Sequence, residues 1–136
     1  MNNSAAFLPQ PYTHVVLHAC KYIDGLNRKC SHNCLFCFEN IDLEKSCKIL
    51  PSIKMIEEVF ADIYKHNKKY GIDKLENIYI AGGEPTMRED IFDIIELASQ
   101  MAHNTFLSSH ADYEQPDILI PKLKKVGITN ISISLH

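Results

Sequence analysis

The sequence has no tryptophan, few glycines and prolines, and no excess of basic side chains. Its 136 residues include 5 glycines and 6 prolines, which excludes collagen-like and low-complexity chains. Lys and Arg number 14 against 17 Asp and Glu, so the net charge is −3 and no nucleic-acid binding through a basic surface is expected. With 46% hydrophobic residues the composition is typical of a globular protein, and residues 1–136 have the length of a single domain.

Long hydrophobic runs are also missing. No apolar stretch approaches the roughly 20 residues that span a bilayer, so we expect no membrane partner. The first residues, Met1 to Pro11, have neither the basic start nor the apolar stretch of a secretory signal. Cysteine is odd in number, with 5 residues, and three of them are crowded together. This distribution favours metal binding in a reducing compartment over a disulfide framework, and we predict a cytoplasmic protein.

Hydrophobic periodicity predicts alternating strands and helices, as in a parallel α/β fold. Strands are expected at residues 14–19, 77–81, 105–108 and 128–135. The first helix should begin after Ser52 as N-cap and end before Gly71. Two further helices are expected at about 89–102 and at 116–126. The start of the last helix stays open, because Pro121 fits only a first turn or a break.

The last predicted strand has two chemically different faces. Ile131, Ile133 and Leu135 alternate with Ser132 and Ser134. In a parallel barrel the aliphatic side chains would lie under the helices and the hydroxyls would point into the interior. Such a strand at the end of the chain would leave an open and fairly apolar edge. We therefore expect the chain to be part of a larger domain, or its edge to be covered by something else.

A long loop at about 20–50 carries the cysteines. Cys30, Cys34 and Cys37 have the spacing C-x3-C-x2-C, so three thiolates can reach one small inorganic centre. Thiolates select iron–sulfur clusters, zinc or Cu(I). A cubane cluster with three protein ligands leaves one iron open to an external ligand, which is a different architecture from a closed structural zinc site.

Structural zinc remains the competing interpretation, because it needs a fourth protein ligand. Cys20, Cys47 or His32 could supply that ligand, and their roles are left open. However, no second C-x2-C pair occurs in the chain. Cys20 and Cys47 are more simply interpreted as small apolar residues, and His32 as a polar loop residue.

A glycine turn follows the second predicted strand directly. Gly82 and Gly83 allow backbone conformations closed to other residues and let a ligand approach the main chain. Pro85 fixes its own φ and biases Glu84 toward an extended conformation. A carboxylate at the carboxyl end of a parallel strand lies where α/β folds place ligands. The turn is no phosphate-binding P-loop, since the Gly-Lys-Ser/Thr ending is missing.

Together, the cysteine triplet after a first strand and Gly-Gly-Glu-Pro after a second resemble the radical S-adenosylmethionine (SAM) superfamily. The resemblance runs from the first strand onward. It implies a partial (β/α) barrel of parallel strands, containing roughly the first four strands and three helices of the family's core domain. It also implies that the segment at about 20–50 is the cluster-binding loop of a single, incomplete core domain.

The resemblance implies a role for each matching residue. Cys30, Cys34 and Cys37 match the ligands of a [4Fe-4S] cluster whose fourth iron chelates SAM, and Phe36 matches an aromatic position near the adenine. The turn matches the segment that contacts the SAM amino group, namely Gly82, Gly83, Glu84 and Pro85. Ser134 resembles a serine near the SAM ribose or carboxylate. Ser108 takes the place of a threonine hydroxyl, in a Ser-Ser-His sequence where many members have Thr-Asn-Gly.

The implied reaction is reductive cleavage of SAM to methionine and a 5′-deoxyadenosyl radical, which abstracts hydrogen from a substrate that the sequence does not identify. The implied partners are that substrate, an electron donor such as a flavodoxin or ferredoxin, and the missing C-terminal part of the barrel. No catalytic residue beyond the cluster ligands is assigned. Two other hypotheses stand beside this one: a small zinc-binding interaction module without catalysis, and a truncated, inactive member of the superfamily.

Overall fold

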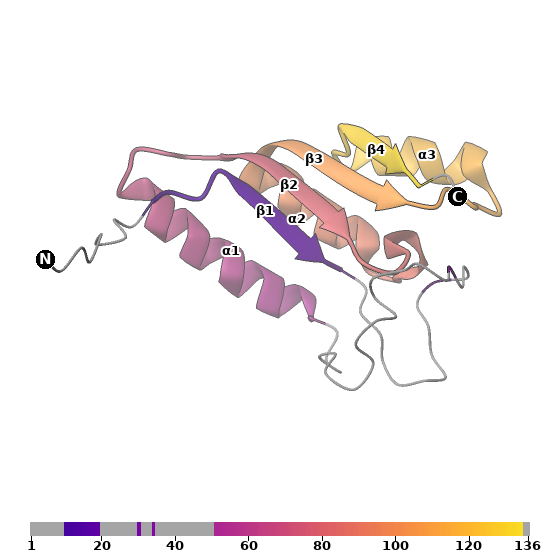
Figure 1. Ribbon diagram of the computed structural model, residues 1–136, viewed down its shortest axis with the longest axis horizontal. Helices are drawn as coiled ribbons and strands as arrows, with labels where there is room; N and C mark the ends of the chain where they lie inside the picture. Colours follow the sequence, from indigo (N-terminus) through magenta and orange to yellow (C-terminus); the bar gives the residue numbers. More distant parts are fainter. Residues whose placement is uncertain (1–9, 20–29, 31–33, 35–50, 135–136) are drawn as a thin grey trace, which may run out of the picture.

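A computed structural model describes residues 10–19, 30, 34 and 51–134 of the chain. Within them, strands and helices alternate along the sequence (Figure 1). The elements are β1 (His14–His18), α1 (Ile53–Lys68), β2 (Leu75–Ala81), the 3-10 turn η2 (Pro85–Met87), α2 (Ile91–Met101), β3 (Ala102–Ser109), α3 (Pro116–Lys125) and β4 (Asn130–Ile133). The four strands form one sheet in the order β1-β2-β3-β4. Every neighbouring pair is parallel, which confirms the predicted partial (β/α) barrel.

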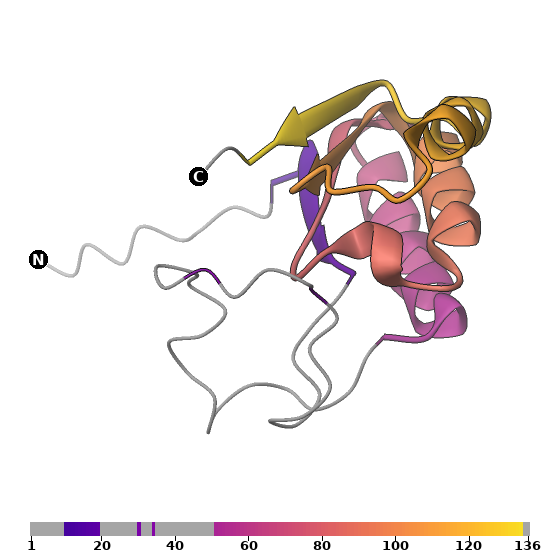
Figure 2. The ribbon, with the colours of Figure 1, turned by 90° about the vertical axis from the view of Figure 1, so that its right-hand side faces the viewer.

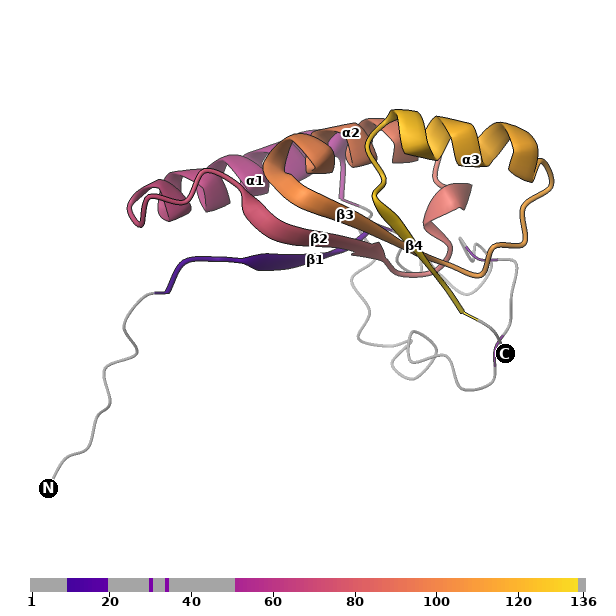
Figure 3. The same ribbon diagram turned by 90° about the horizontal axis from the view of Figure 1, so that it is seen from above.

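The three helices lie together on one face of the sheet, as two perpendicular views show (Figures 2 and 3). The buried apolar side chains fill the space between this helical layer and the sheet. They include Ile56, Phe60, Leu75, Ile78, Ile80, Ile91, Ile94, Ile95, Leu107 and Leu123. At roughly 25 cal/mol for each Å² of apolar surface removed from water, this burial is the main force that holds helices and sheet together. None of the helices in these described ranges is long and apolar enough to cross a membrane.

Local signals explain where α1 begins and ends. The Ser52 Oγ accepts a hydrogen bond from the Met55 backbone N–H at 3.3 Å, so Ser52 caps the helix as predicted. Ile56 and Phe60 lie one turn apart and are buried against the sheet. Gly71 follows the helix with a φ of 73°, a left-handed conformation that glycine adopts without a Cβ penalty.

Two boundaries differ from the sequence prediction. Helix α2 ends at Met101 and Ala102 is already extended, with φ −130° and ψ 159°, so β3 begins three residues earlier than expected. Helix α3 begins at Pro116 and runs through Pro121, which is neither in the first turn nor at a break. Packing explains this continuity: Leu119 contacts the core before the proline, and Leu123, fully buried, contacts it after. The contacts on both sides keep the helix direction although Pro121 donates no backbone hydrogen bond.

Strand β4 begins two residues later than predicted, because Ile128 and Thr129 belong to the connection between α3 and the strand. The Ile128 N–H bonds the Leu123 carbonyl at the end of α3. Ile131 packs against the core, as the alternation predicted, whereas the Ile133 side chain is 52% exposed. Ser132, on the opposite face, pairs through its Cα with Ser108 of β3. Leu135 lies outside the described residues.

Candidate functional site

The glycine turn follows the carboxyl end of β2. Gly82 and Gly83 have φ values of 91° and 45°, both in the left-handed region. Gly83 is exposed and Gly82 is half-buried, whereas Glu84 and Pro85 are buried. The turn therefore offers an accessible backbone without Cβ atoms, followed at once by two residues fixed in the interior.

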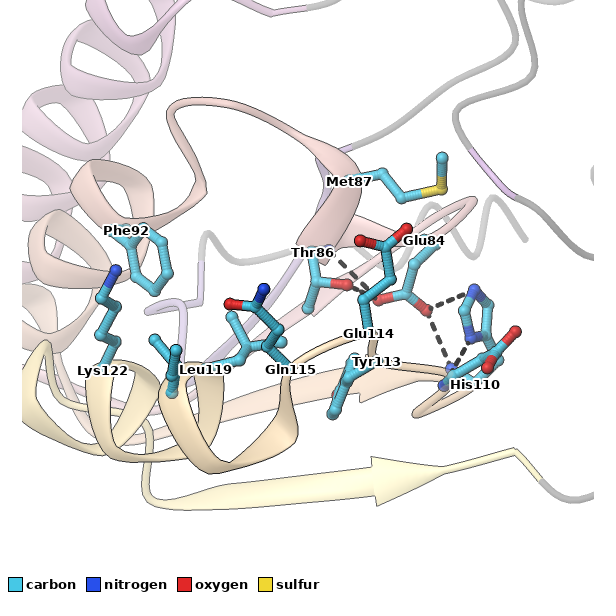
Figure 4. A pocket seen from close by; sticks show the side chains of 12 residues that line it. Glu84, Thr86, Met87, Phe92, His110, Tyr113, Glu114, Gln115, Leu119 and Lys122 are labelled. Atoms are coloured by element: carbon cyan, nitrogen blue, oxygen red, sulfur yellow. Dashed lines mark hydrogen bonds and ion pairs between the residues drawn. The ribbon is translucent and has the colours of Figure 1, made fainter.

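The Glu84 carboxylate is the anchor of this turn. Its residue is 0% exposed, and its Oε1 accepts hydrogen bonds from the Thr86 N–H at 3.2 Å and the Thr86 hydroxyl at 2.6 Å. The Ser109 hydroxyl lies 2.9 and 3.0 Å from the two carboxylate oxygens. The His110 N–H donates to Oε2 at 2.9 Å, and Figure 4 shows the contacts of Glu84 with Thr86 and His110. A buried carboxylate is tolerated only when such donors replace water. Glu84 thus ties the end of β2 to the end of β3.

Ser109 is the branching point of this network. Its Oγ donates to Glu84 and accepts from the Tyr113 hydroxyl at 2.8 Å and the Ala111 N–H at 2.9 Å. Ala111 adopts a φ of 58°, which is unfavourable for a residue with a Cβ, so the loop conformation is held against a local cost. Burial, joined by the negative charge of Glu84, raises the pKa of Tyr113 above 10.0, although the bond to Ser109 opposes the shift.

His110 faces Glu84 from the same loop. The Asp112 N–H donates to the His110 Nδ1 at 3.0 Å, so Nδ1 is an acceptor and the ring proton of the neutral form lies on Nε2. That Nε2 lies 3.4 Å from the Glu84 Oε2. One ring nitrogen is therefore oriented by its own loop through Asp112, and the other faces the carboxylate of the turn after β2.

A pocket of about 570 Å³ opens beside this network, between η2, α2 and α3 (Figure 4). It is lined by Glu84, Thr86, Met87, Phe92, His110, Asp112, Tyr113, Glu114, Gln115, Ile118, Leu119 and Lys122. The helical layer supplies much of this lining, which places the pocket on the helix side of the sheet. The Glu84 carboxylate is consequently turned toward the helical layer.

The structure describes only part of the predicted ligand set. Cys30 and Cys34 are both half-buried. Cys37 and Phe36 lie outside the described residues, as do Cys20, Cys47 and His32. Within the part of the chain that is described, no group of three or more metal-ligating side chains is assembled.

The sequence matches the radical SAM superfamily over residues 26–136. The chain belongs to that superfamily. The match contains both motifs from which the resemblance was inferred, the cysteine triplet and the glycine turn.

Several curated proteins are similar to this radical SAM chain. A probable GTP 3′,8-cyclase of Thermoplasma volcanium is 26% identical over 116 residues, which is 82% of this chain and 31% of that protein. The molybdenum cofactor biosynthesis protein moc-5 of Caenorhabditis elegans is 30% identical over 82% of this chain and 18% of its own. A 7,8-dihydro-6-hydroxymethylpterin dimethyltransferase of Methanocaldococcus jannaschii is 33% identical over 80% and 20%. The chain spans less than a third of the length of each of these relatives.

The described residues fit the two groups that radical SAM membership implies. Cysteine thiolates are the ligands that iron–sulfur clusters use. The exposed backbone at Gly82 and Gly83 can approach a ligand closely, and Glu84 holds that backbone in place. Because the Glu84 carboxylate already accepts from four protein donors, the turn offers its backbone to a ligand.

The two predicted serines lie differently with respect to the Glu84 network. Ser108 lies between the buried Leu107 and Ser109 in β3, so its side chain points to the opposite face of the sheet. Ser134 is exposed, and its backbone N–H bonds the Ser109 carbonyl at 2.9 Å. The structure thus places Ser108 on the sheet face that the described helices leave uncovered, and the assignments of Ser108 and Ser134 to SAM remain predictions.

Sequence reasoning missed Ser109, His110 and Tyr113. The alternation of buried residues along β3 was a usable signal, because Thr105, Leu107 and Ser109 share the face toward the helices. The partner of Ser109 is Glu84, 25 positions earlier in the chain. A contact of that separation follows from strand register, which the sequence pattern alone does not specify.

Proposed function

We propose that this chain binds a [4Fe-4S] cluster through Cys30, Cys34 and Cys37 and SAM against the turn Gly82–Pro85, as part of a radical SAM enzyme. The observation that carries the proposal is the turn itself, with an exposed glycine backbone anchored by a fully buried carboxylate at the carboxyl end of a parallel strand. Membership of the superfamily favours the cluster over structural zinc. When bound, the two groups supply one-electron cleavage of the SAM sulfonium, which yields methionine and a 5′-deoxyadenosyl radical.

The residues of the chain would bind and orient. Cys30, Cys34 and Cys37 would hold the cluster through their thiolates, and the backbone carbonyls of residues 82–84 would accept hydrogen bonds from the SAM amino group. Holding SAM in one orientation would be an orientation effect on its cleavage. Phe36 would lie near the adenine and Ser134 near the ribose or carboxylate. Ser108 would supply a cofactor-binding hydroxyl in place of the family's threonine, on the sheet face opposite the helices.

The sheet face opposite the helices also carries aromatic and amide side chains that fit one class of substrate. Tyr79 and Phe106 stack there with their rings 4.8 Å apart, and the Asn104 Nδ2 donates to the Asn77 Oδ1 at 3.1 Å. A flat heterocycle could stack on such rings and bond such amides. Two of the relatives are named for a GTP cyclase and for a pterin dimethyltransferase. A purine nucleotide or a pterin is therefore the substrate class that we propose to test first.

The proposal also sets the surroundings in which the chain works. Cleavage of SAM needs an electron, so a reductant such as a flavodoxin or ferredoxin is expected as partner. Cluster thiolates require a reducing compartment, which supports a cytoplasmic location.

The decisive experiment is anaerobic reconstitution of the wild type and Cys34→Ala, with Cys47→Ala as matched control. We expect about four irons with equivalent sulfide for the wild type and the control, and none for Cys34→Ala, since the triplet has no spare ligand. Full iron in Cys34→Ala would refute the ligand assignment. A colourless wild type with a single zinc would favour the zinc module instead. A loaded wild type that fails to cleave SAM with dithionite would favour the inactive member.

A further inference from the structure

Arg88 is a buried cation that the proposed chemistry does not use. It follows η2 directly and is 4% exposed. Its Nη1 donates to the Ala19 carbonyl at 2.7 Å and its Nη2 to the Pro51 carbonyl at 2.6 Å. On its other edge, Nε and Nη2 bond the two oxygens of Asp90 at 2.5 and 2.9 Å. One guanidinium thus makes four directed hydrogen bonds.

The two carbonyls have a special place in the chain. Ala19 extends β1, since its N–H bonds the Ala81 carbonyl at 2.8 Å. Pro51 precedes Ser52, the N-cap of α1. Residues 20–50, which carry the cysteine triplet, therefore begin directly after one carbonyl held by Arg88 and end directly before the other.

Arginine is suited to this place because its donors have a fixed fork geometry. The planar group can bond two carbonyls on one side and a carboxylate on the other, whereas a lysine ammonium is a point charge on a flexible stem. The bidentate contact with Asp90 fixes the plane of the guanidinium, and the hydrogen bonds from Arg88, joined by its positive charge, lower the pKa of Asp90 although partial burial opposes the shift. The guanidinium is thereby oriented toward the two carbonyls.

We propose that Arg88 is a positioning residue that holds Ala19 and Pro51, the two described residues that flank the cysteine-bearing part of the sequence, in a fixed place relative to the SAM-contacting turn. Arg88 stands three residues after Pro85 of the turn, and its side chain holds the two carbonyls that flank residues 20–50. This inference rests on the proposed function for its ligands, but the contacts are independent of them. Separation of cluster and turn matters, because a misplacement of about 1 Å can cost roughly a hundredfold in an oriented reaction.

The test uses Arg88→Met, Arg88→Lys and Asp90→Asn, with Lys68→Met as control. Lys68 is an ion-paired cation on Asp73 that touches neither carbonyl. For each variant we would measure iron and sulfide after anaerobic reconstitution, SAM affinity, and the change that SAM causes in the electron paramagnetic resonance spectrum of the reduced cluster. In the metal-free protein we would measure the rate of trypsin cleavage after Lys21 and Lys48, which are close in sequence to Ala19 and Pro51, because loss of the Arg88 bonds should let these two described ends open more often.

For Arg88→Met we expect wild-type iron content, SAM affinity weakened roughly tenfold, a diminished spectral response to SAM, and severalfold faster cleavage at both lysines. Arg88→Lys should recover part of each loss, and Lys68→Met should match the wild type. A general loss of stability would lower iron content and SAM affinity together, so the split between them identifies positioning.

Arg88→Met with SAM affinity within about twofold of the wild type and unchanged cleavage would overturn the inference. If Arg88→Met does not fold, Asp90→Asn decides by the same measurements, because loss of the bidentate carboxylate frees the guanidinium plane and should weaken both carbonyl bonds. If the wild type takes up no cluster, the proposed function fails, and the cleavage rates of the metal-free protein still support or overturn the clamp made by Arg88.

Discussion

The two ends of the sheet carry their charges in opposite ways. At the amino-terminal end, near the start of β2, Lys68 pairs with Asp73 while their side chains stay 47% and 72% exposed. At the carboxyl end, Glu84 and Arg88 are 0% and 4% exposed. An exposed pair remains solvated and contributes little, whereas a buried charge is tolerated only when protein donors or acceptors replace water.

The difference shows that the desolvation cost of buried charges is met at the carboxyl end of the sheet. Glu84 and Arg88 each make several directed bonds to loops rather than to each other, and those bonds connect the end of β2 with β3, the end of β1 and the start of α1. A buried polar network of this kind specifies one geometry when every member is bonded. The loss of any one member leaves buried groups unpaired and lowers the stability of the fold. The buried charges at the carboxyl end therefore fix the positions of neighbouring segments, whereas the charged pair at the amino-terminal end stays in contact with solvent.

Replacement of the buried Glu84 carboxylate should change the free energy of unfolding more than any other substitution considered at either end of the sheet. Glu84→Gln keeps the shape but puts an NH₂ group where donors from Ser109, His110 and Thr86 converge. We expect a loss of about 3–4 kcal/mol in the free energy of unfolding, because donors then face a donor in the interior. Chemical denaturation measures the loss, with Lys68→Met, at the other end of the sheet, as the control that should leave the midpoint unchanged.

Equal midpoints for Glu84→Gln and the wild type would mean that the carboxylate carries no structural role. In that case the turn would depend on Pro85 and the glycines alone.

Two glycines at the amino-terminal end of the sheet differ in how closely their backbone is packed. Gly127 and Gly71 both have left-handed φ values, 106° and 73°, but a Cβ on Gly127 would lie 2.4 Å from the Ser99 Cβ, whereas none of the described atoms lies within 4 Å of one on Gly71. Gly71→Ala should cost about 1 kcal/mol from the backbone conformation. Gly127→Ala should cost about 2–3 kcal/mol, since the clash with α2 adds to it. Equal losses in thermal unfolding would show that the contact with Ser99 relaxes freely.

The regular elements were predictable because short-range patterns determine them. Hydrophobic periodicity predicted α1, in which Ile56 and Phe60 are buried, and Ser52 was recognisable as its cap. Pro121 was misleading, since its local preference against a helix interior is overridden by the tertiary contacts of Leu119 and Leu123. Strand ends were the weakest part, as β3 shows by beginning at Ala102.

The site was predictable as a pair of motifs and less so as a network. Glycines before a buried Glu84 indicated a ligand-binding turn, and the superfamily match confirms the family that the motifs resembled. Ser109 bonds Glu84 from 25 positions away in the sequence, and Arg88 bonds Ala19 from 69 positions away. Such contacts depend on the register of parallel strands and on loop closure, neither of which leaves a local pattern.

The smallest expected effect concerns the outer edge of the Glu84 network. Tyr113→Phe removes the hydroxyl that donates to Ser109, and should cost about 1 kcal/mol at neutral pH, because no buried donor is left unpaired. In a Ser109→Ala background the same change should cost less, which a double-mutant cycle measures. Unchanged costs in both backgrounds would show that the two hydroxyls are not coupled.

Ionisation of Tyr113 should make the stability of the fold decrease at alkaline pH. Burial raises the folded-state pKa of Tyr113 above its ordinary 10.0, so the unfolded chain loses this proton first as the pH rises. The stability that Tyr113 contributes is therefore complete below pH 10.0 and is lost as the pH climbs through the folded-state pKa. Tyr113→Phe should flatten the alkaline fall of the denaturation midpoint relative to the wild type. A variant with the wild-type slope would mean that Tyr113 ionises alike in both states, and that the Glu84 network ends at Ser109.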